Sequence, residues 1–233
     1  MEFPEKVCYN TSVLYCIPKP DPSGIGNNNK EELNMNKLSE KIQKLVGTGL
    51  LTALVIVIYL LTMGLTIGPF NITFALIPIV VGAALYGWSA GTWLGLVFGA
   101  MVLFTGGGNA FLVINAPGTI ATVLVKGAAA GAVSGLVYKA LEKKNRWAAT
   151  ICAAAAAPIV NTGIFLIGCL LFFMGTINEW AAGAGFENAG LYMISAFVGV
   201  NFLVELGTNL VLSSAIVRIL DVVKKPSAPK TAG

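Results

Sequence analysis

The chain of 233 residues is 56% hydrophobic and only 11% charged, whereas ordinary soluble domains carry roughly 25% charged residues. Its net charge of +4 is modest, and no Asp, Glu, Lys or Arg occurs between Leu45 and Val125. So long an uncharged stretch excludes an ordinary soluble domain, because such a domain needs a charged face toward water. The sequence therefore predicts an all-α integral membrane protein, in which each span needs about 20 apolar residues.

Residues 1–40 differ in composition from the rest of the chain. They are rich in turn-forming residues and have no periodic apolar face, which is typical of disordered segments. We predict a disordered N-terminal extension at 1–40, a membrane domain at 41–223 and a flexible C-terminal tail at 224–233. Because Met35 begins the segment MNKLSEKIQKLVG, we hypothesise that residues 1–34 precede the natural start.

Six apolar segments follow, and we predict that each is a transmembrane helix of one six-helix bundle. In chain order they are 46–63, 74–86, 92–104, 119–140, 148–173 and 189–220. The second and third are short for a bilayer, so we expect them to extend into their flanking links. No internal repeat is obvious, which disfavours an inverted-repeat transporter.

The basic residues predict how the bundle is oriented. One side carries Lys37, Lys41, Lys44, Lys139, Lys143, Lys144, Arg146, Arg218, Lys224 and Lys225. The opposite links contain no Lys or Arg, and their only charged residues are Glu179 and Glu187. Since cytoplasmic loops are enriched in Lys and Arg, we predict a multi-pass protein with both termini in the cytoplasm.

The outward-facing links combine aromatic rings with side-chain amides. These residues are Phe70 and Asn71 in the first link, Asn109, Phe111 and Asn115 in the second, and Trp180 and Phe186 in the third. Rings beside amides suit a heteroaromatic or amphipathic solute. An interfacial belt also explains the aromatic residues, so both interpretations stay open.

Two ionisable residues, Lys126 and Glu205, fall inside predicted spans. Each costs about 2.5–3.5 kcal/mol at the centre of a transmembrane helix, so each is expected to face the bundle interior or a water-filled pocket. Lys126 precedes Lys139 by 13 residues, and Glu205 precedes Arg218 by 13. At about 1.5 Å per residue both lie roughly 20 Å from the inner basic residues, and Asn161 on the fifth segment lies at about 22 Å.

Two interpretations of these polar residues at a similar depth remain. Asn201 and Asn209 each lie four residues from Glu205, so all three project from one helix face. One interpretation is a buried ion pair between Lys126 and Glu205, with Asn161 bonding between helices. The other is a polar pocket for a small hydrophilic molecule, which the length of the polar ladder favours.

A pair of small residues on the first segment indicates close helix contact. Gly49 and Ala53 have the small-xxx-small spacing that lets helices approach, either inside the bundle or against a partner membrane protein. The chain has no His, no metal-ligand cluster and no phosphate-binding lysine motif. We therefore predict no metal site, no cofactor and no catalytic residues, and any ATP must be hydrolysed by other subunits.

Several stretches together resemble the substrate-binding S component of an energy-coupling factor (ECF) vitamin transporter over about 45–223. They are ITFALIPIVVGAALYGWSAGTWLGLVFG, APGTIATVLVKGAAAGAVSGLVYKAL, NTGIF and VNFLVELGTNLVL. The resemblance implies a six-helix vitamin binder in a prokaryotic plasma membrane, working with a transmembrane coupling subunit and two cytoplasmic ATPases. It also implies docking through Gly49 and Ala53, where the family has Ala-x-x-x-Ala. The first outer loop, 65–71, would close the pocket, and the subunit would topple in the membrane to release its ligand.

The ligand is expected to be a water-soluble vitamin, without a nucleic-acid partner. Lys126 suits a carboxylate, while Glu205 and Asn201 can exchange hydrogen bonds with hydroxyls or amides. Pantothenate fits this pattern, and folate, riboflavin or a pyrimidine precursor also remain. A self-sufficient carrier or channel is the alternative, and a membrane-embedded enzyme is disfavoured by the missing His.

Overall fold

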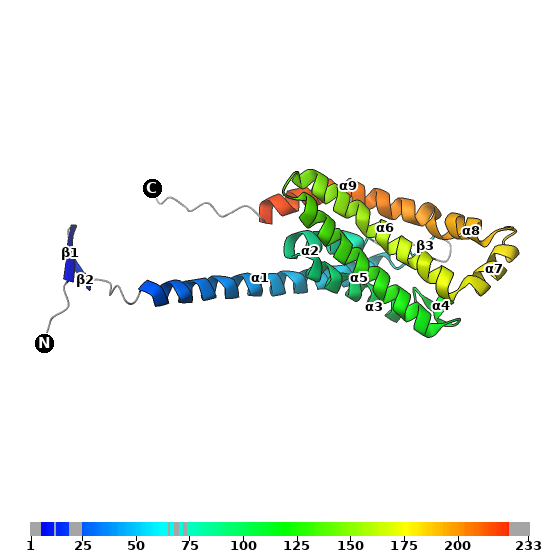
Figure 1. Cartoon of the computed structure of the whole chain (residues 1–233), viewed down its shortest axis with the longest axis horizontal. Helices are drawn as coiled ribbons and strands as arrows, with labels where there is room; N and C mark the ends of the chain where they lie inside the picture. Colours follow the sequence, from blue (N-terminus) through cyan, green and yellow to red (C-terminus); the bar gives the residue numbers. More distant parts are fainter. Residues whose placement is uncertain are drawn as a thin grey trace. The chain divides into compact units, whose positions relative to one another are not determined.

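The computed structural model describes residues 6–11, 13–18, 25–64, 66–67, 70–71 and 74–223. The helices are α1 (Ile25–Thr62), α2 (Leu76–Tyr86), α3 (Trp88–Phe104), α4 (Asn109–Leu112), α5 (Ala116–Leu141), α6 (Arg146–Phe172), α7 (Met174–Gly183), α8 (Ala189–Tyr192), the π-helical turn η1 (Met193–Val198) and α9 (Gly199–Val223). The strands are β1 (Lys6–Thr11), β2 (Val13–Pro18), β3 (Thr66–Ile67) and β4 (Phe70–Asn71). The predicted helical membrane domain is thus present (Figure 1).

The chain divides into two compact units, Met1–Val46 and Gly47–Gly233. In the first, β1 and β2 form an antiparallel hairpin, and α1 begins at Ile25. This differs from the predicted disorder of residues 1–40. The segment KEELNMNKLSEK consists largely of residues with good helix propensity, which support a helix without a periodic apolar face. The predicted tail at 224–233 lies outside the described residues.

Four helices of the described chain are long and apolar enough to cross a membrane. They are Glu40–Thr62, Ala116–Leu141, Arg146–Phe172 and Phe202–Leu220. Helices α2 and α3 overlap the second and third predicted segments, and α3 begins earlier than predicted, but both are shorter than these four helices. The last predicted segment is interrupted by η1. A total of six spans therefore stays a prediction.

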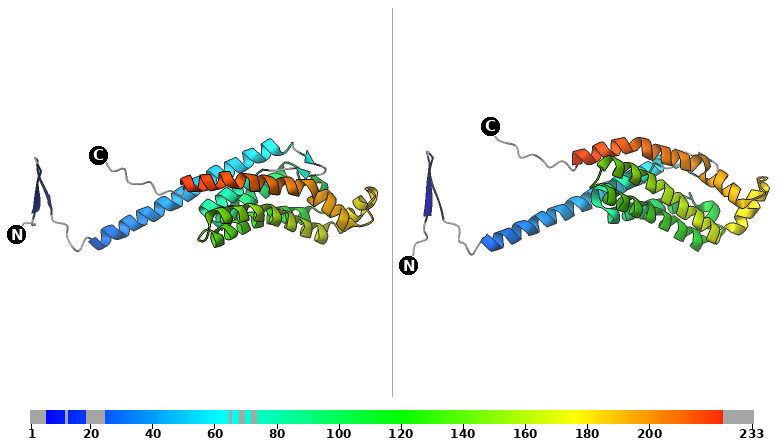
Figure 2. Two further views of the ribbon diagram at one scale, coloured as in Figure 1. Left: turned by 90° about the horizontal axis from the view of Figure 1, so that it is seen from above. Right: turned by 45° about the horizontal axis from the view of Figure 1, so that its top comes forward.

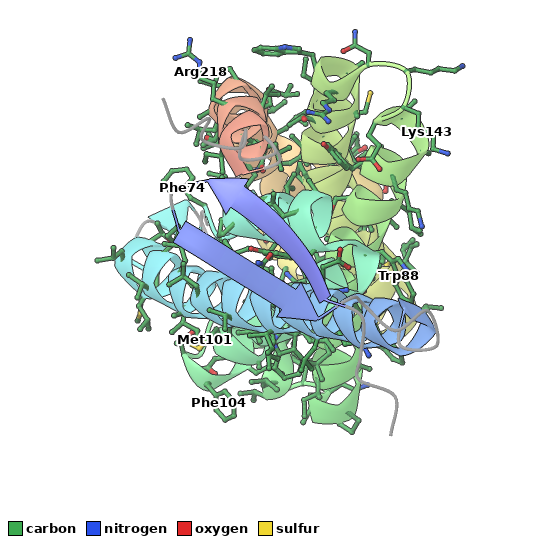
Figure 3. The ribbon with its side chains drawn as sticks, turned by 90° about the vertical axis from the view of Figure 1, so that its left-hand side faces the viewer. Phe74, Trp88, Met101, Phe104, Lys143 and Arg218 are labelled. Atoms are coloured by element: carbon green, nitrogen blue, oxygen red, sulfur yellow. The ribbon has the colours of Figure 1, made fainter. Side chains whose placement is uncertain are left out.

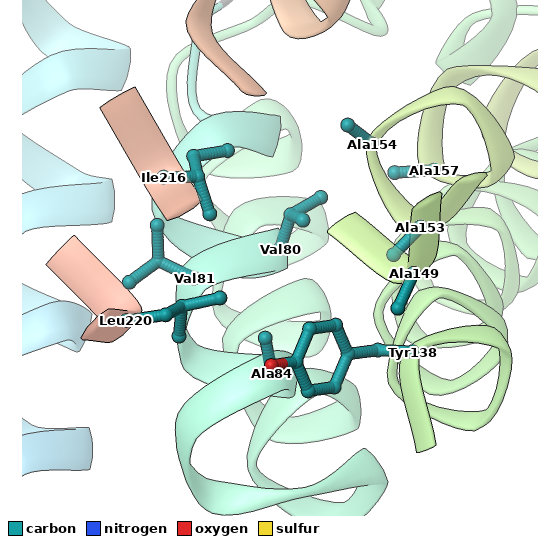
Figure 4. Close-up of a cluster of buried hydrophobic side chains, with 10 residues drawn as sticks. All are labelled: Val80, Val81, Ala84, Tyr138, Ala149, Ala153, Ala154, Ala157, Ile216 and Leu220. Carbon is teal, nitrogen blue, oxygen red and sulfur yellow. The ribbon is translucent and has the colours of Figure 1, made fainter. Parts of the chain in front are cut away.

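Helix α2 packs at the centre of the second unit. Its Val80, Val81 and Ala84 contact side chains of α5, α6 and α9 in one apolar cluster (Figure 4). The other members are Tyr138, Ala149, Ala153, Ala154, Ala157, Ile216 and Leu220. The alanines of α6 leave room for the larger side chains opposite, so three helices close tightly around α2.

Helices α3 and α5 pack backbone to backbone (Figure 1). A methyl group added to Gly91 would overlap the carbonyl oxygen of Gly131, and one added to Gly95 would overlap that of Gly127. Only glycine allows this approach, which is the usual reason for small residues between membrane helices. The pairing fixes the register of α5 against α3.

One end of the bundle is covered by short helices. Helices α4, α7 and α8 lie at the end away from the C-terminal residues of α9, and the two views of Figure 2 show the same arrangement for the yellow and light orange segments. Buried apolar side chains join them, namely Phe111, Cys169, Phe173, Ile177, Ala181, Ala189 and Met193. The opposite end carries exposed basic residues, among them Lys143 and Arg218 (Figure 3).

Candidate functional site

Lys126 lies between aromatic and acidic side chains from two other helices. Its Nζ sits over the ring of Phe165 on α6, 5.2 Å from the ring centroid. It is also attracted electrostatically to Glu205 on α9, whose side chain is only 4% exposed. A cation over an aromatic face gains about 0.5–2 kcal/mol, more as water is removed. Lys126 on α5 and Glu205 on α9 therefore lie close enough to interact, while their role in binding stays a prediction.

A cavity of about 40 Å³ adjoins Lys126. Helices α3 to α6 and the loop before α4 enclose it. Its lining is Val102, Gly107, Gly108, Phe111, Thr119, Thr122, Val123, Lys126, Phe165 and Phe173. Of the residues predicted to bind a ligand, only Lys126 and Phe111 are among them. Thr122 could have been found from its spacing, since it precedes Lys126 by one helical turn on the same face.

Phe111 is the centre of an aromatic cluster beside this cavity. Its ring centroid lies 5.6 Å from that of Phe165, 5.0 Å from that of Phe173 and 5.6 Å from that of Trp180. All three pairs meet edge to face, the arrangement that aromatic quadrupoles favour. Trp180, predicted as a ligand contact or belt residue, packs against Phe111 and does not line the cavity.

Three buried polar side-chain atoms have no hydrogen-bond partner within the described chain. They are Thr122 Oγ1, Asn161 Oδ1 and Asn209 Oδ1. The exposed fractions of these residues are 6%, 7% and 1%. Leaving such an atom unpaired in the interior costs about 1–3 kcal/mol. Asn209 is half satisfied, because its Nδ2 donates to the backbone carbonyl of Glu205 at 2.8 Å.

Several predicted residues lie outside this site. Asn115 caps α5, where its Oδ1 accepts a hydrogen bond from the Gly118 amide at 3.0 Å, and Asn109 is exposed on α4. The sequence Asn-Ala-Pro is a recognisable helix start with proline in the first turn, so the capping role of Asn115 was predictable.

For three further predicted residues only the backbone is described. Asn201 belongs to α9, and Phe70 and Asn71 form β4. Their side chains lie outside the described part of the chain.

Gly49 and Ala53 lie on an exposed face of α1. No atom lies within 4 Å of a methyl group built on Gly49, and Ala53 is exposed. Their neighbours Leu50, Leu54 and Val57 are exposed as well. The small residues are thus available to an apolar partner.

Comparison with known proteins gives one match over most of the chain. The family model described as "ECF transporter, substrate-specific component" matches residues 43–217. No curated protein and no solved structure matches the chain significantly.

Proposed function

The chain belongs to the substrate-specific components of ECF transporters, and from this premise we propose that it captures a water-soluble vitamin or related micronutrient in the membrane. Members of this family are substrate-binding transport subunits rather than enzymes. Pantothenate, folate, riboflavin and a pyrimidine precursor are the candidates that the polar residues suggest. The chain delivers its ligand to a coupling module.

The observation that carries the proposal is the position of Lys126. An ammonium group at a cavity inside an apolar bundle costs free energy that a purely structural helix would avoid. It is retained beside aromatic walls and an unpartnered hydroxyl, and these are the features of a small-molecule site with a few convergent polar groups. The polar ladder of Asn161, Glu205 and Asn209 extends this site toward α6 and α9.

The partners follow from the family and from the exposed face of α1. We assign Gly49 and Ala53 to contact with a transmembrane coupling subunit, because their small side chains let a second helix approach. Two cytoplasmic ATPases supply the energy. The basic end with Lys143 and Arg218 then faces the cytoplasm, together with both chain termini.

Ligand capture is tested on the purified full chain in detergent. Small molecules released on denaturation are identified by mass spectrometry, and calorimetry with a vitamin panel gives affinities. Lys126→Ala and Glu205→Ala should each weaken binding at least about tenfold, or roughly 1.4 kcal/mol, because each removes a charge at the site.

The control is Ser134→Ala on α5. The Ser134 hydroxyl donates a hydrogen bond of 3.1 Å to the Gly131 carbonyl, and Ser134 does not line the cavity. It should bind as the wild type does. Folded Lys126→Ala and Glu205→Ala proteins with unchanged affinity would remove the site assignment, and a wild-type protein that binds no vitamin would remove the function.

A further inference from the structure

Thr122 differs from the other buried threonines of the described helices. Thr62, Thr119 and Thr150 donate their hydroxyls to the carbonyl four residues earlier, at 2.8–2.9 Å. This local bond is how a helix usually satisfies a buried threonine. Thr122 Oγ1 has no partner among the described residues, although it is buried and lines the cavity.

Helix α6 leaves space for the Thr122 side chain. A methyl group at Gly168 on α6 would overlap the Thr122 side chain, so glycine there leaves room for it. Thr122 and Lys126 are four residues apart on α5, and both line the same cavity. The side chains of Thr122 and Lys126 therefore line one small volume.

The volume of the cavity and the charges beside it limit which chemical group of a ligand can bind there. A cavity of about 40 Å³ has room for about three water-sized groups, at roughly 10–15 Å³ each, which matches a carboxylate carbon with its two oxygens. Glu205 already offsets part of the Lys126 charge. With Lys126 and Glu205 both charged, a bound carboxylate leaves one net negative charge and a phosphate dianion leaves two, so the carboxylate costs less free energy to bury in this apolar surrounding.

The side chains that line the cavity indicate the chemistry of the ligand segment next to the carboxylate. Phe111, Phe165 and Phe173 present rings to it. Such walls favour an apolar or planar segment and offer no hydrogen bonds to a hydroxyl-rich one.

We propose that this cavity is a carboxylate subsite, in which the Lys126 ammonium and the Thr122 hydroxyl bind the carboxylate of a monoanionic ligand. This inference rests on the proposed function and narrows its substrate class to carboxylic acids over neutral vitamins. Lys126 supplies the charge that selects an acid, and Thr122 adds to this specificity through one hydrogen bond to the anion.

The test compares acids with neutral analogues in which an alcohol or an amide replaces the carboxylate. Calorimetry on the purified full chain uses pantothenate against pantothenol, nicotinate against nicotinamide and biotin against biotin amide, with riboflavin as a neutral vitamin. At least one acid should bind, and its neutral analogue should bind at least thirtyfold more weakly. Thr122→Val should weaken the acid about tenfold and leave the analogue unchanged, while Thr122→Ser should retain the wild-type preference.

Lys126→Met should abolish the preference for the acid, with Ser134→Ala as the matched control on the same helix. Equal affinity for an acid and its analogue, an unchanged Thr122→Val protein, or binding of riboflavin alone would overturn the subsite and leave the proposed function standing. A folded protein that binds no member of the panel and releases no vitamin on denaturation would overturn both.

Discussion

At the scale of single residues, the question is how an ammonium group is tolerated inside an apolar bundle. Lys126 is partly buried, lies over the face of Phe165 and is attracted to Glu205. Removing one member of such a group leaves the other charge with less compensation, which costs more than the pair itself contributes. The two charges should therefore depend on each other energetically.

A double-mutant cycle measures this dependence. Glu205→Gln should lower the thermal midpoint of unfolding by several degrees, since about 1 kcal/mol corresponds to roughly 2–4 °C for a domain of this size. Lys126→Met combined with Glu205→Gln should lose less than the sum of the two single variants, with a coupling of about 1 kcal/mol. Strictly additive losses would show that the two charges do not interact.

At the scale of elements, the glycines between α3 and α5 determine where Lys126 stands. Gly127 meets the backbone of Gly95, and Lys126 is the adjacent residue. Close backbone approach permits weak Cα–H···O contacts and prevents α5 from shifting along α3. The pairing therefore fixes α5, which supplies four residues of the cavity lining, against α3, which supplies Val102.

Gly95→Ala tests this element directly. Its methyl group would overlap the Gly127 carbonyl oxygen, so the variant should lower the thermal midpoint and weaken ligand binding together. Gly207→Ala on α9 is the control, because no atom lies within 4 Å of the added methyl group. Both are measured by thermal unfolding and calorimetry, and a Gly95→Ala protein as stable as the control would contradict the packing.

The sequence allowed the helices to be placed, but only part of the site. Counting residues from the basic ends predicted that Lys126 and Glu205 lie at one height, because helix rise is regular. Phe111 was predicted to bind because it lies in an outward-facing link, whereas Phe165 could not be assigned to the cavity, since one phenylalanine in an apolar run looks like another until the helices are packed. Asn115 was assigned to binding although its capping motif was visible, because an uncharged loop amide suits either role.

At the scale of the whole molecule, α1 has two different faces. Tyr59 packs edge-on against Phe98 at 5.8 Å and its hydroxyl lies 3.0 Å from that of Thr105. Gly49 and Ala53 instead lie on an exposed face. A helix held on one side and exposing small residues on the other is arranged to receive a further helix.

Ala53→Trp separates binding from transport. The bulky ring should block the coupling subunit while leaving the distant cavity intact, so ligand affinity stays at the wild-type value and uptake into cells is abolished. Leu171→Trp on α6, where the side chain is already large and 70% exposed, is the control and should transport normally. Uptake at the wild-type rate by Ala53→Trp would remove the docking assignment.

The unpartnered atoms of Thr122, Asn161 and Asn209 also make the stability of the folded chain depend on its ligand. A ligand that pairs with them stabilises the folded chain by RT ln(1 + [L]/Kd), so the receptor is most easily unfolded when its nutrient is scarce. Since proteases remove unfolded chains, a bound ligand should slow the turnover of the folded subunit.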